Sequence, residues 1–143
     1  MNVEEKRIYL IRELIKENPK LGSIEIPKDK DGQKILLRSL MNIREPKAIS
    51  KEFLEIQDSY LQEILKEKKI THISDLSPIA DDIYIFKGDI TTIECGAIVY
   101  AANSGMTGCY VPCHNCIDNA IHKYEGIELR VECAEIMRKQ GHE

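Results

Sequence analysis

Three cysteines and one histidine lie within eight positions of the chain, at Cys109, Cys113, His114 and Cys116. Thiolate and imidazole ligands together suit zinc best among the common biological metals. The whole chain carries five cysteines, an odd number. In a reducing compartment such crowding favours metal binding or thiol chemistry over a disulfide framework. We therefore expect a zinc site in this segment.

This cluster can hold zinc in two ways. If all four side chains bind, the site is closed and structural, whereas three ligands leave a fourth position for water or a substrate oxygen. Four ligands in one short segment, two of them adjacent at Cys113 and His114, are hard to aim at the corners of one tetrahedron. The spacing therefore favours an open site made by Cys109, His114 and Cys116, with Cys113 turned away.

Interpretations without a metal remain open. The thiols could be reduced cysteines beside one surface histidine, or Cys113 and Cys116 could form a redox pair of the Cys-x-x-Cys type. His122 lies one helical turn after Asp118. We expect it to be an ordinary helical histidine rather than a further ligand.

The first half of the chain predicts helices. Hydrophobic residues recur at helical spacing in residues 4–17, in a second run that ends near Asn42, and from Ser50 to about Lys66. Charged residues between these positions fit a solvated outer face. Residues 1–78 are therefore expected to form a helical unit.

The second half has an α/β pattern. Residues 83–86 and 96–100 read as strands, and the second run is apolar on both faces, as in a central parallel strand. Residues 116–124 and 126–140 predict two helices. Two strands are fewer than an independently stable sheet normally needs. We therefore expect residues 79–143 to be an α/β domain that is incomplete at its C-terminus.

Composition and charge restrict the classes of partner that we expect. The chain has 143 residues, a net charge of −4 and a sequence pI near 5.6. Without a basic stretch, a nucleic-acid partner is not expected. The apolar runs are too short to span a membrane, and the acidic start at Glu4 and Glu5 is unlike a signal peptide. We expect a cytoplasmic protein with no membrane or nucleic-acid partner.

These segments together resemble a known family. Residues 87–91, Lys-Gly-Asp-Ile-Thr, and residues 96–104, Gly-Ala-Ile-Val-Tyr-Ala-Ala-Asn-Ser, resemble the opening of a macrodomain, the α/β module that binds ADP-ribose. Residues 108–122 resemble the zinc-dependent branch of that family, whose members hydrolyse ADP-ribosyl groups from modified proteins. The resemblance implies a three-layer α/β/α fold for residues 79–143. Residues 1–78 are similar in character to the N-terminal extension of this branch.

The resemblance also implies roles for single residues. Asp89, with Ile90 beside it, would bind the adenine end of ADP-ribose, the carboxylate accepting from the adenine amino group. Asn103 would contact the distal ribose and take part in catalysis, and the open zinc site would lie beside that ribose. Asp118 would act in catalysis by orienting a zinc ligand.

Each of these residues has a plain structural explanation as well. Asp89 after Gly88 is a common turn or helix-capping residue. Asn103 suits a left-handed turn. Asp118 could cap the helix that begins near Ile117.

The sequence departs from the family pattern at two places. Tyr100 stands where the family usually has the first asparagine of its Asn-Ala-Ala-Asn run, and the bulkier ring could reshape the ribose end of the pocket or pack in the core. The second departure is that the family's later strands and its glycine-rich loop for the diphosphate have no counterpart up to residue 143 and would follow it. A dinucleotide-like ligand needs the backbone amides of such a loop around its pyrophosphate.

The expected function is that of a zinc-dependent hydrolase that removes mono-ADP-ribose from modified proteins, with Zn²⁺ as its cofactor. Two alternatives come from other classes of protein. One is a module that binds ADP-ribose without cleaving it. The other is a zinc-stabilised interaction protein, for which all four ligands would come from the chain.

Overall fold

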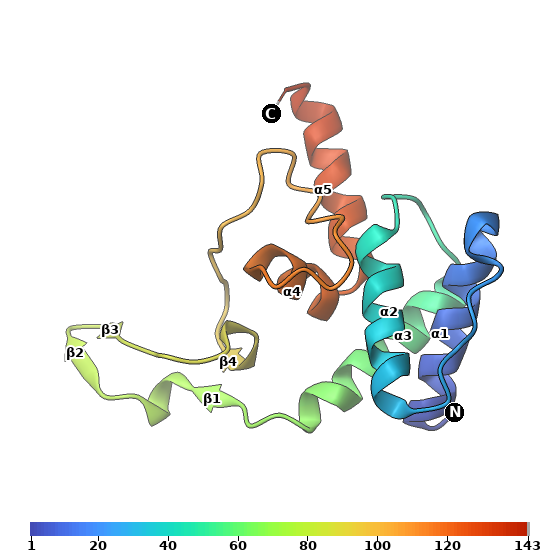
Figure 1. Cartoon of the computed structure of the whole chain (residues 1–143). Helices are drawn as coiled ribbons and strands as arrows, with labels where there is room; N and C mark the ends of the chain where they lie inside the picture. The colour runs from blue at the N-terminus through green and yellow to red at the C-terminus, as the bar shows by residue number, and fades with distance from the viewer. Residues whose placement is uncertain (143) are drawn as a thin grey trace.

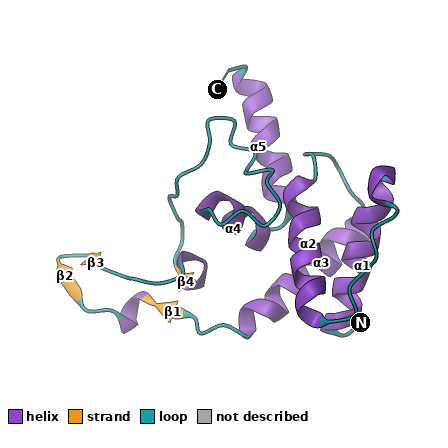
Figure 2. Ribbon diagram, viewed as in Figure 1, coloured by secondary structure: helices purple, strands orange, loops and turns teal. Residues whose placement is uncertain are grey.

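The chain has a mixed α/β structure in which helices dominate (Figures 1 and 2). The structure is a computed structural model, and it describes residues 1–142. Its α-helices are α1 (Val3–Glu17), α2 (Lys30–Ile43), α3 (Lys51–Lys66), α4 (Ile117–Tyr124) and α5 (Ile127–Gln140). Its strands are β1 (Thr71–His72), β2 (Pro78–Ala80), β3 (Ile83–Tyr84) and β4 (Ile93–Glu94). All five helices predicted from the hydrophobic pattern are confirmed, with ends shifted by a few residues at most.

Side-chain caps fix where the first helices begin. Asn2 and Glu5 form a reciprocal capping box at the start of α1, at 2.8 and 2.9 Å. Asp29 accepts from the amide of Gly32 at 2.7 Å at the start of α2, and Ser50 caps α3. Because a cap satisfies amides that have no partner inside the helix, each boundary is encoded locally.

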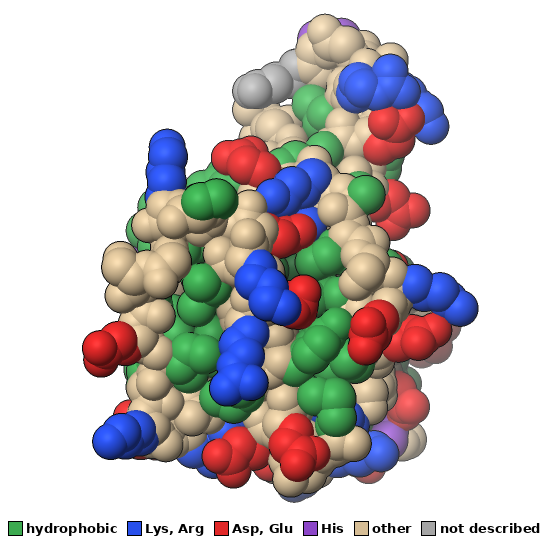
Figure 3. Space-filling model, turned by 90° about the vertical axis from the view of Figure 1, so that its right-hand side faces the viewer, with side chains coloured by type: hydrophobic (Ala, Val, Ile, Leu, Met, Phe, Trp, Pro, Cys, Tyr) green, Lys and Arg blue, Asp and Glu red, His purple; other side chains and the backbone are tan. Residues whose placement is uncertain are grey.

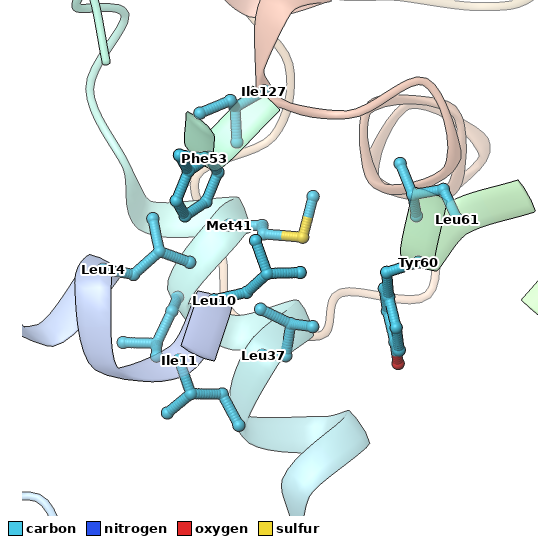
Figure 4. Packing of buried hydrophobic residues seen from close by; sticks show 10 residues of the cluster. Leu10, Ile11, Leu14, Leu37, Met41, Phe53, Tyr60, Leu61 and Ile127 are labelled. Atoms are coloured by element: carbon cyan, nitrogen blue, oxygen red, sulfur yellow. The ribbon is translucent and has the colours of Figure 1, made fainter. Parts of the chain in front are cut away.

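The hydrophobic core lies between α1, α2 and α3 (Figure 4). Leu10 and Ile11 of α1 and Phe53 of α3 are almost fully buried, with 1%, 0% and 1% of their surface exposed. Burying one such side chain stabilises the fold by about 1.5–3 kcal/mol. This cluster makes residues 1–66 a helical platform for the rest of the chain.

A buried glutamine joins α5 to this platform. Ile127 of α5 reaches the hydrophobic core, and its backbone N–H donates to Oε1 of Gln57 in α3 at 3.0 Å. Gln57 is itself only 1% exposed. An isolated amide in an apolar core would be unfavourable. This hydrogen bond therefore fixes where α5 begins on the surface of α3.

The sheets are small. β1 pairs in parallel with β4 through Thr71–Ile93 and His72–Glu94, and β2 pairs with β3 in an antiparallel hairpin with an irregular register. Residues 67–103, which include all four strands, run outside the helices as an extended arm (Figures 1 and 2). The three-layer sandwich implied by the family resemblance is not seen in residues 1–142.

The predicted strand at residues 96–100 is wrong for this structure. These residues pair with no strand among the described residues, and Val99 is 95% exposed. The predicted strand at residues 83–86 is confirmed only at Ile83 and Tyr84. The physical reason is that a strand exists through its pairing, which the apolar pattern of one segment cannot supply.

The surface of the helical platform carries both signs of charge. On the face turned toward the viewer in Figure 3, lysines, arginines and acidic side chains alternate with hydrophobic ones, and no single-sign patch covers that face. Helix α5 projects above it with Arg138 and Lys139 in its last turn. None of the helices in residues 1–142 combines the length and the apolar character needed to cross a membrane.

Candidate metal centre

The structure brings the three predicted zinc ligands together. We call residues 108–116 the metal loop. Within it, one ligand atom from each of Cys109, His114 and Cys116 lies within 4.8 Å of the other two. Sγ of Cys109 is 3.5 Å from Nδ1 of His114. Both cysteines are half-buried and His114 is exposed, so the group opens toward solvent on one side.

These distances fit zinc. With Zn–S bonds of about 2.3 Å and Zn–N bonds of about 2.0–2.1 Å, a sulfur and a nitrogen at two corners of a tetrahedron lie about 3.6 Å apart. The observed separation of 3.5 Å between Cys109 Sγ and His114 Nδ1 matches that edge. Two thiolates and one imidazole are a donor set that zinc prefers. The group could therefore hold a zinc ion with three protein ligands.

Cys113 points away from this group. Its Sγ lies 3.2 Å from the hydroxyl of Ser39 and donates to the carbonyl of Ile35 at 3.5 Å, both in α2. Its φ of 53° is in the left-handed region, which turns the backbone sharply between Cys109 and His114. The expected exclusion of Cys113 thus has a geometric basis, because its neighbours on α2 hold it outside the cluster.

Cys116 also lies at the start of α4. Its Sγ accepts from the backbone N–H of Asn119 at 3.4 Å, which makes Cys116 the N-cap of this helix. The alternative explanation of Asp118 as the helix cap is therefore wrong. Asp118 instead lies in the first turn of α4, where its charge is favourable to the helix dipole.

Asn103 and Asp118 lie side by side below the metal loop. Nδ2 of Asn103 donates to the carbonyl of Gly108 at 3.0 Å and to Oδ2 of Asp118 at 3.3 Å. Asp118 is 6% exposed, whereas Asn103 is exposed. The left-handed turn expected at Asn103 is wrong, because Met106 adopts the positive φ, 56°. The pair therefore connects the metal loop to the segment that precedes it.

A buried histidine lies against this pair. Nε2 of His122 is 3.5 Å from Oδ1 of Asp118. Burial, followed by the positive charge of Arg130, lowers the pKa of His122 below its ordinary value, and Asp118 opposes the shift. Neither ring nitrogen has a hydrogen-bond partner among the described residues, so neutral His122 is the favoured form. It does not belong to the group that could hold a metal.

Gly108 is required by this arrangement. Its φ is +84°, and a Cβ atom there would lie 2.7 Å from Cδ2 of His122. Both the backbone conformation and the close approach of the ring favour glycine. The metal loop therefore begins on a residue whose missing side chain makes room for His122.

Tyr100 is half-buried near Asp118. Burial raises the pKa of its phenol, and the negative charge of Asp118 adds to the effect. The phenol is therefore neutral beside the carboxylate. Tyr100 does not belong to the buried hydrophobic core cluster.

Asp89 and Ile90 lie apart from the metal loop, on the extended arm. Asp89 caps a short 3₁₀ helix, Ile90–Thr92, by accepting from the backbone N–H of Thr91 at 3.0 Å, and it forms an ion pair with Lys68 at 3.0 Å. Partial burial alone would raise the pKa of Asp89, but the hydrogen bonds from Thr91 and Lys68 hold it below its usual value. The carboxylate is therefore ionised and able to accept hydrogen bonds.

Sequence reasoning missed the residues of α2 that contact the metal loop. Arg38 and Asn42 lie one helical turn apart and both bond to this loop, as does Ser39 between them. The available signal was a set of polar residues on the face next to the apolar stripe of an amphipathic helix. Nothing local indicated which segment they would meet.

Comparison with known proteins gives relatives over the whole chain. No model of a known protein family matches it. A protein-ADP-ribose hydrolase of Treponema medium is 56% identical over 147 aligned positions, which cover 100% of this chain and 56% of the relative. A protein-ADP-ribose hydrolase of Staphylococcus aureus (strain Mu50 / ATCC 700699) is 40% identical over 93% of this chain and 50% of the relative.

A third relative has a composite name. It is a probable bifunctional ADP-ribose hydrolase/ADP-ribosyltransferase of Fusarium oxysporum f. sp. cubense, 39% identical over 76% of this chain but only 20% of its own length. The chain thus spans about half the length of the bacterial relatives it matches. By sequence, it is a homologue of enzymes named protein-ADP-ribose hydrolase.

Proposed function

We propose that this chain is part of a zinc-dependent hydrolase of the macrodomain type that removes mono-ADP-ribose from modified proteins. One observation carries the proposal: three ligand atoms of Cys109, His114 and Cys116 lie within 4.8 Å of one another and leave one side open to solvent. The names of the relatives supply the substrate class. A mono-ADP-ribosylated protein is accordingly the partner that we assign.

The donor set defines what the metal would contribute. Bound zinc with an open position supplies Lewis-acid chemistry, polarising a ribose hydroxyl or a water molecule. Cys109, His114 and Cys116 would hold it, and the contact of the Cys113 thiol with Ser39 would keep a fourth ligand from closing the site. The chain's own residues then have to position the ribose.

We assign Asn103 and Asp118 to that task. The amide nitrogen of Asn103 is held by Gly108 and Asp118, which fixes the orientation of the side chain. We assign its Oδ1 to accept from a hydroxyl of the distal ribose. Oδ1 of Asp118 is buried without a hydrogen-bond partner among residues 1–142. We assign Asp118 to catalysis through Oδ2, which holds Nδ2 of Asn103 at 3.3 Å, because Oδ1 faces His122 and has almost no surface open to a ligand.

The adenine end would lie toward the extended arm. Asp89 is ionised, and we assign its carboxylate to accept from the adenine amino group, with Ile90 against the ring. Lys68 now occupies one of its oxygens at 3.0 Å, so the base would share or replace this ion pair. We further propose that residues 1–78 are the helical extension, residues 79–143 belong to a three-layer macrodomain, and the protein acts in the cytoplasm.

The first experiment measures zinc and turnover on one sample of the full chain. We expect about one zinc per chain by elemental analysis and release of ADP-ribose from a mono-ADP-ribosylated protein. Cys116→Ala should abolish both, because it removes a ligand. Cys95→Ser is the matched control, since Cys95 is exposed and outside the group that could hold a metal.

Cys113→Ser separates the open site from a closed one. In the open site the serine hydroxyl keeps the contact with Ser39, and zinc content and turnover remain close to those of the wild type. Loss of zinc in this variant would indicate four protein ligands and favour a zinc-stabilised interaction protein. Binding of ADP-ribose without release would favour a binding module, and a chain without zinc would overturn the proposal.

A further inference from the structure

We propose that Arg38 and Asn42 of α2 are positioning residues for the zinc ligands, so that the helical platform is part of the metal centre. The inference rests on the proposed zinc site and goes beyond it, because neither side chain offers a ligand to the metal. It implies that zinc affinity is set in part by a helix about 70 residues away in sequence.

Arg38 holds one side of the metal loop. Its Nη2 donates to the backbone carbonyl of His114 at 2.9 Å and to Oδ1 of Asn119 at 2.8 Å, and its Nε donates to the same Asn119 oxygen at 3.1 Å. No carboxylate in residues 1–142 forms an ion pair with Arg38. Its planar fork therefore serves to bridge the metal loop and α4 rather than to neutralise a charge.

Asn42 holds the other side. Its Oδ1 accepts from the backbone N–H of Cys113 at 3.1 Å, and only 1% of its surface is exposed. Cys113 has a positive φ of 53°, a conformation that a non-glycine residue adopts only where its surroundings stabilise it. The hydrogen bond to Asn42 and the contact of the Cys113 thiol with Ser39 stabilise this conformation.

The two contacts together fix the direction of a ligand. Arg38 donates to the carbonyl of His114, and Asn42 accepts from the amide of Cys113. Helix α2 therefore holds both ends of the backbone unit formed by Cys113 and His114. With its ends held, the backbone torsion angles between them have little freedom, which fixes the direction of the Cα–Cβ bond of His114. From this position Nδ1 of His114 lies 3.5 Å from Sγ of Cys109. Pre-orientation of a ligand raises metal affinity because less freedom is lost on binding.

Two further residues stabilise these contacts between α2 and the metal loop. Asn119 is fully buried, and its Nδ2 donates to the carbonyl of Val111 at 3.1 Å while its Oδ1 receives Arg38. Arg130 of α5 donates to the backbone carbonyl of Asn42 at 2.7 Å, which anchors the end of α2. Side chains of α2 and α4 therefore bond to the metal loop, and Arg130 of α5 bonds in turn to the end of α2.

The test measures zinc affinity by competition with a chromophoric chelator. Arg38→Met keeps the length and apolar stem of the side chain and removes every donor. We expect its zinc affinity to fall about 10–100-fold, the range found when residues behind metal ligands are replaced. Arg12→Met is the matched control, since Arg12 is exposed on α1, and it should leave affinity unchanged.

Asn42 offers a test by rescue. Asn42→Leu removes the acceptor for the Cys113 amide and should lower zinc affinity as Arg38→Met does. Asn42→Asp keeps an oxygen at the same place and should restore most of the affinity. Cobalt in place of zinc reports the geometry directly: its visible absorption bands should change in Arg38→Met and Asn42→Leu but not in Asn42→Asp or Arg12→Met.

Loss of folding is separated from loss of positioning by the thermal midpoint of the metal-free chain. If Arg38→Met does not fold, Arg38→Lys replaces it, because lysine keeps the charge but cannot bridge His114 and Asn119 with a planar fork. Wild-type affinity and cobalt spectra in a folded variant would overturn the inference. A wild-type chain that binds zinc without releasing ADP-ribose from a modified protein would contradict the proposed function alone.

Discussion

At the scale of single residues, His122 makes stability depend on pH. Burial and the charge of Arg130 lower its pKa from the ordinary value of 6.5, while Asp118 opposes the change. Between the lowered pKa and 6.5 the unfolded chain therefore binds more protons than the folded chain. The free energy of unfolding should rise with pH through this window and gain nothing further from this group above it.

Urea denaturation of the chain at matched zinc content, between pH 5.5 and pH 7.5, measures this dependence. His122→Asn removes the titrating group at a similar polarity, and its stability should change less over the same range. An equal slope for wild type and His122→Asn would show that other groups cause the dependence.

The candidate site shows what can be predicted residue by residue. The grouping of Cys109, His114 and Cys116 follows from donor chemistry and from the strain of placing adjacent residues on one tetrahedron. The local explanations for Asp118 and Asn103 were wrong because two neighbouring residues can serve equally well as cap or turn. Cys116 caps α4, and Met106 takes the positive φ.

At the scale of elements, Gly126 decides how α5 docks on α3. Its φ is +84°, and a Cβ atom there would lie 2.4 Å from Nε2 of Gln57. We expect Gly126→Ala to destabilise the chain by about 1–3 kcal/mol, through backbone strain and displacement of the buried Gln57. The midpoint of urea unfolding, followed by circular dichroism, measures this change.

Gly96→Ala is the control for this substitution. It makes the same chemical change at a glycine with no heavy atom within 4 Å of the added Cβ. Its unfolding midpoint should stay close to that of the wild type. If Gly126→Ala were equally mild, the docking of α5 would not depend on this close approach.

Elements differ in how far local sequence determines them. The hydrophobic period of each helix lies within about sixteen residues, and α1 to α4 each have a side-chain cap at the start, so the helices could be placed in advance. Residues 96–100 have the composition of a buried strand, but extended backbone becomes a strand only beside a partner. The pattern was therefore sufficient for the helices and insufficient for this segment.

At the scale of the whole molecule, the arm carries unpaired backbone. Residues 96–102 form no ladder hydrogen bonds with any described strand, and Val99 is 95% exposed. Their amides should exchange with solvent rapidly, whereas those of Leu10 and Ile11 in the core should exchange only on global unfolding. Hydrogen exchange read by mass spectrometry distinguishes the two classes.

Protein concentration provides the control for this experiment. Exposed apolar strands can pair with a second chain. Protection of residues 96–102 that increases with concentration would show such pairing. Protection that does not depend on concentration would contradict the unpaired state of these residues.

The long-range contacts explain why the sequence predicts the ligands of the site but not the residues that support them. The metal loop could be found from its own residues, but its contacts with Arg38 and Asn42 join positions 71 and 76 residues apart. Polar residues on a helix do not reveal which distant segment they will meet. The chemistry of the centre is thus local in sequence, whereas the support for its geometry is not.

The N-cap of helix α4 is Cys116, and the sulfur atom that caps the helix is also a proposed zinc ligand. Occupancy of the metal and order in the first turn of α4 are then linked equilibria, in which each stabilises the other by the same free energy. Substitutions far along α4 that merely raise its helical propensity should therefore tighten zinc binding. In this chain the helix–coil equilibrium of α4 would therefore set part of the affinity for zinc.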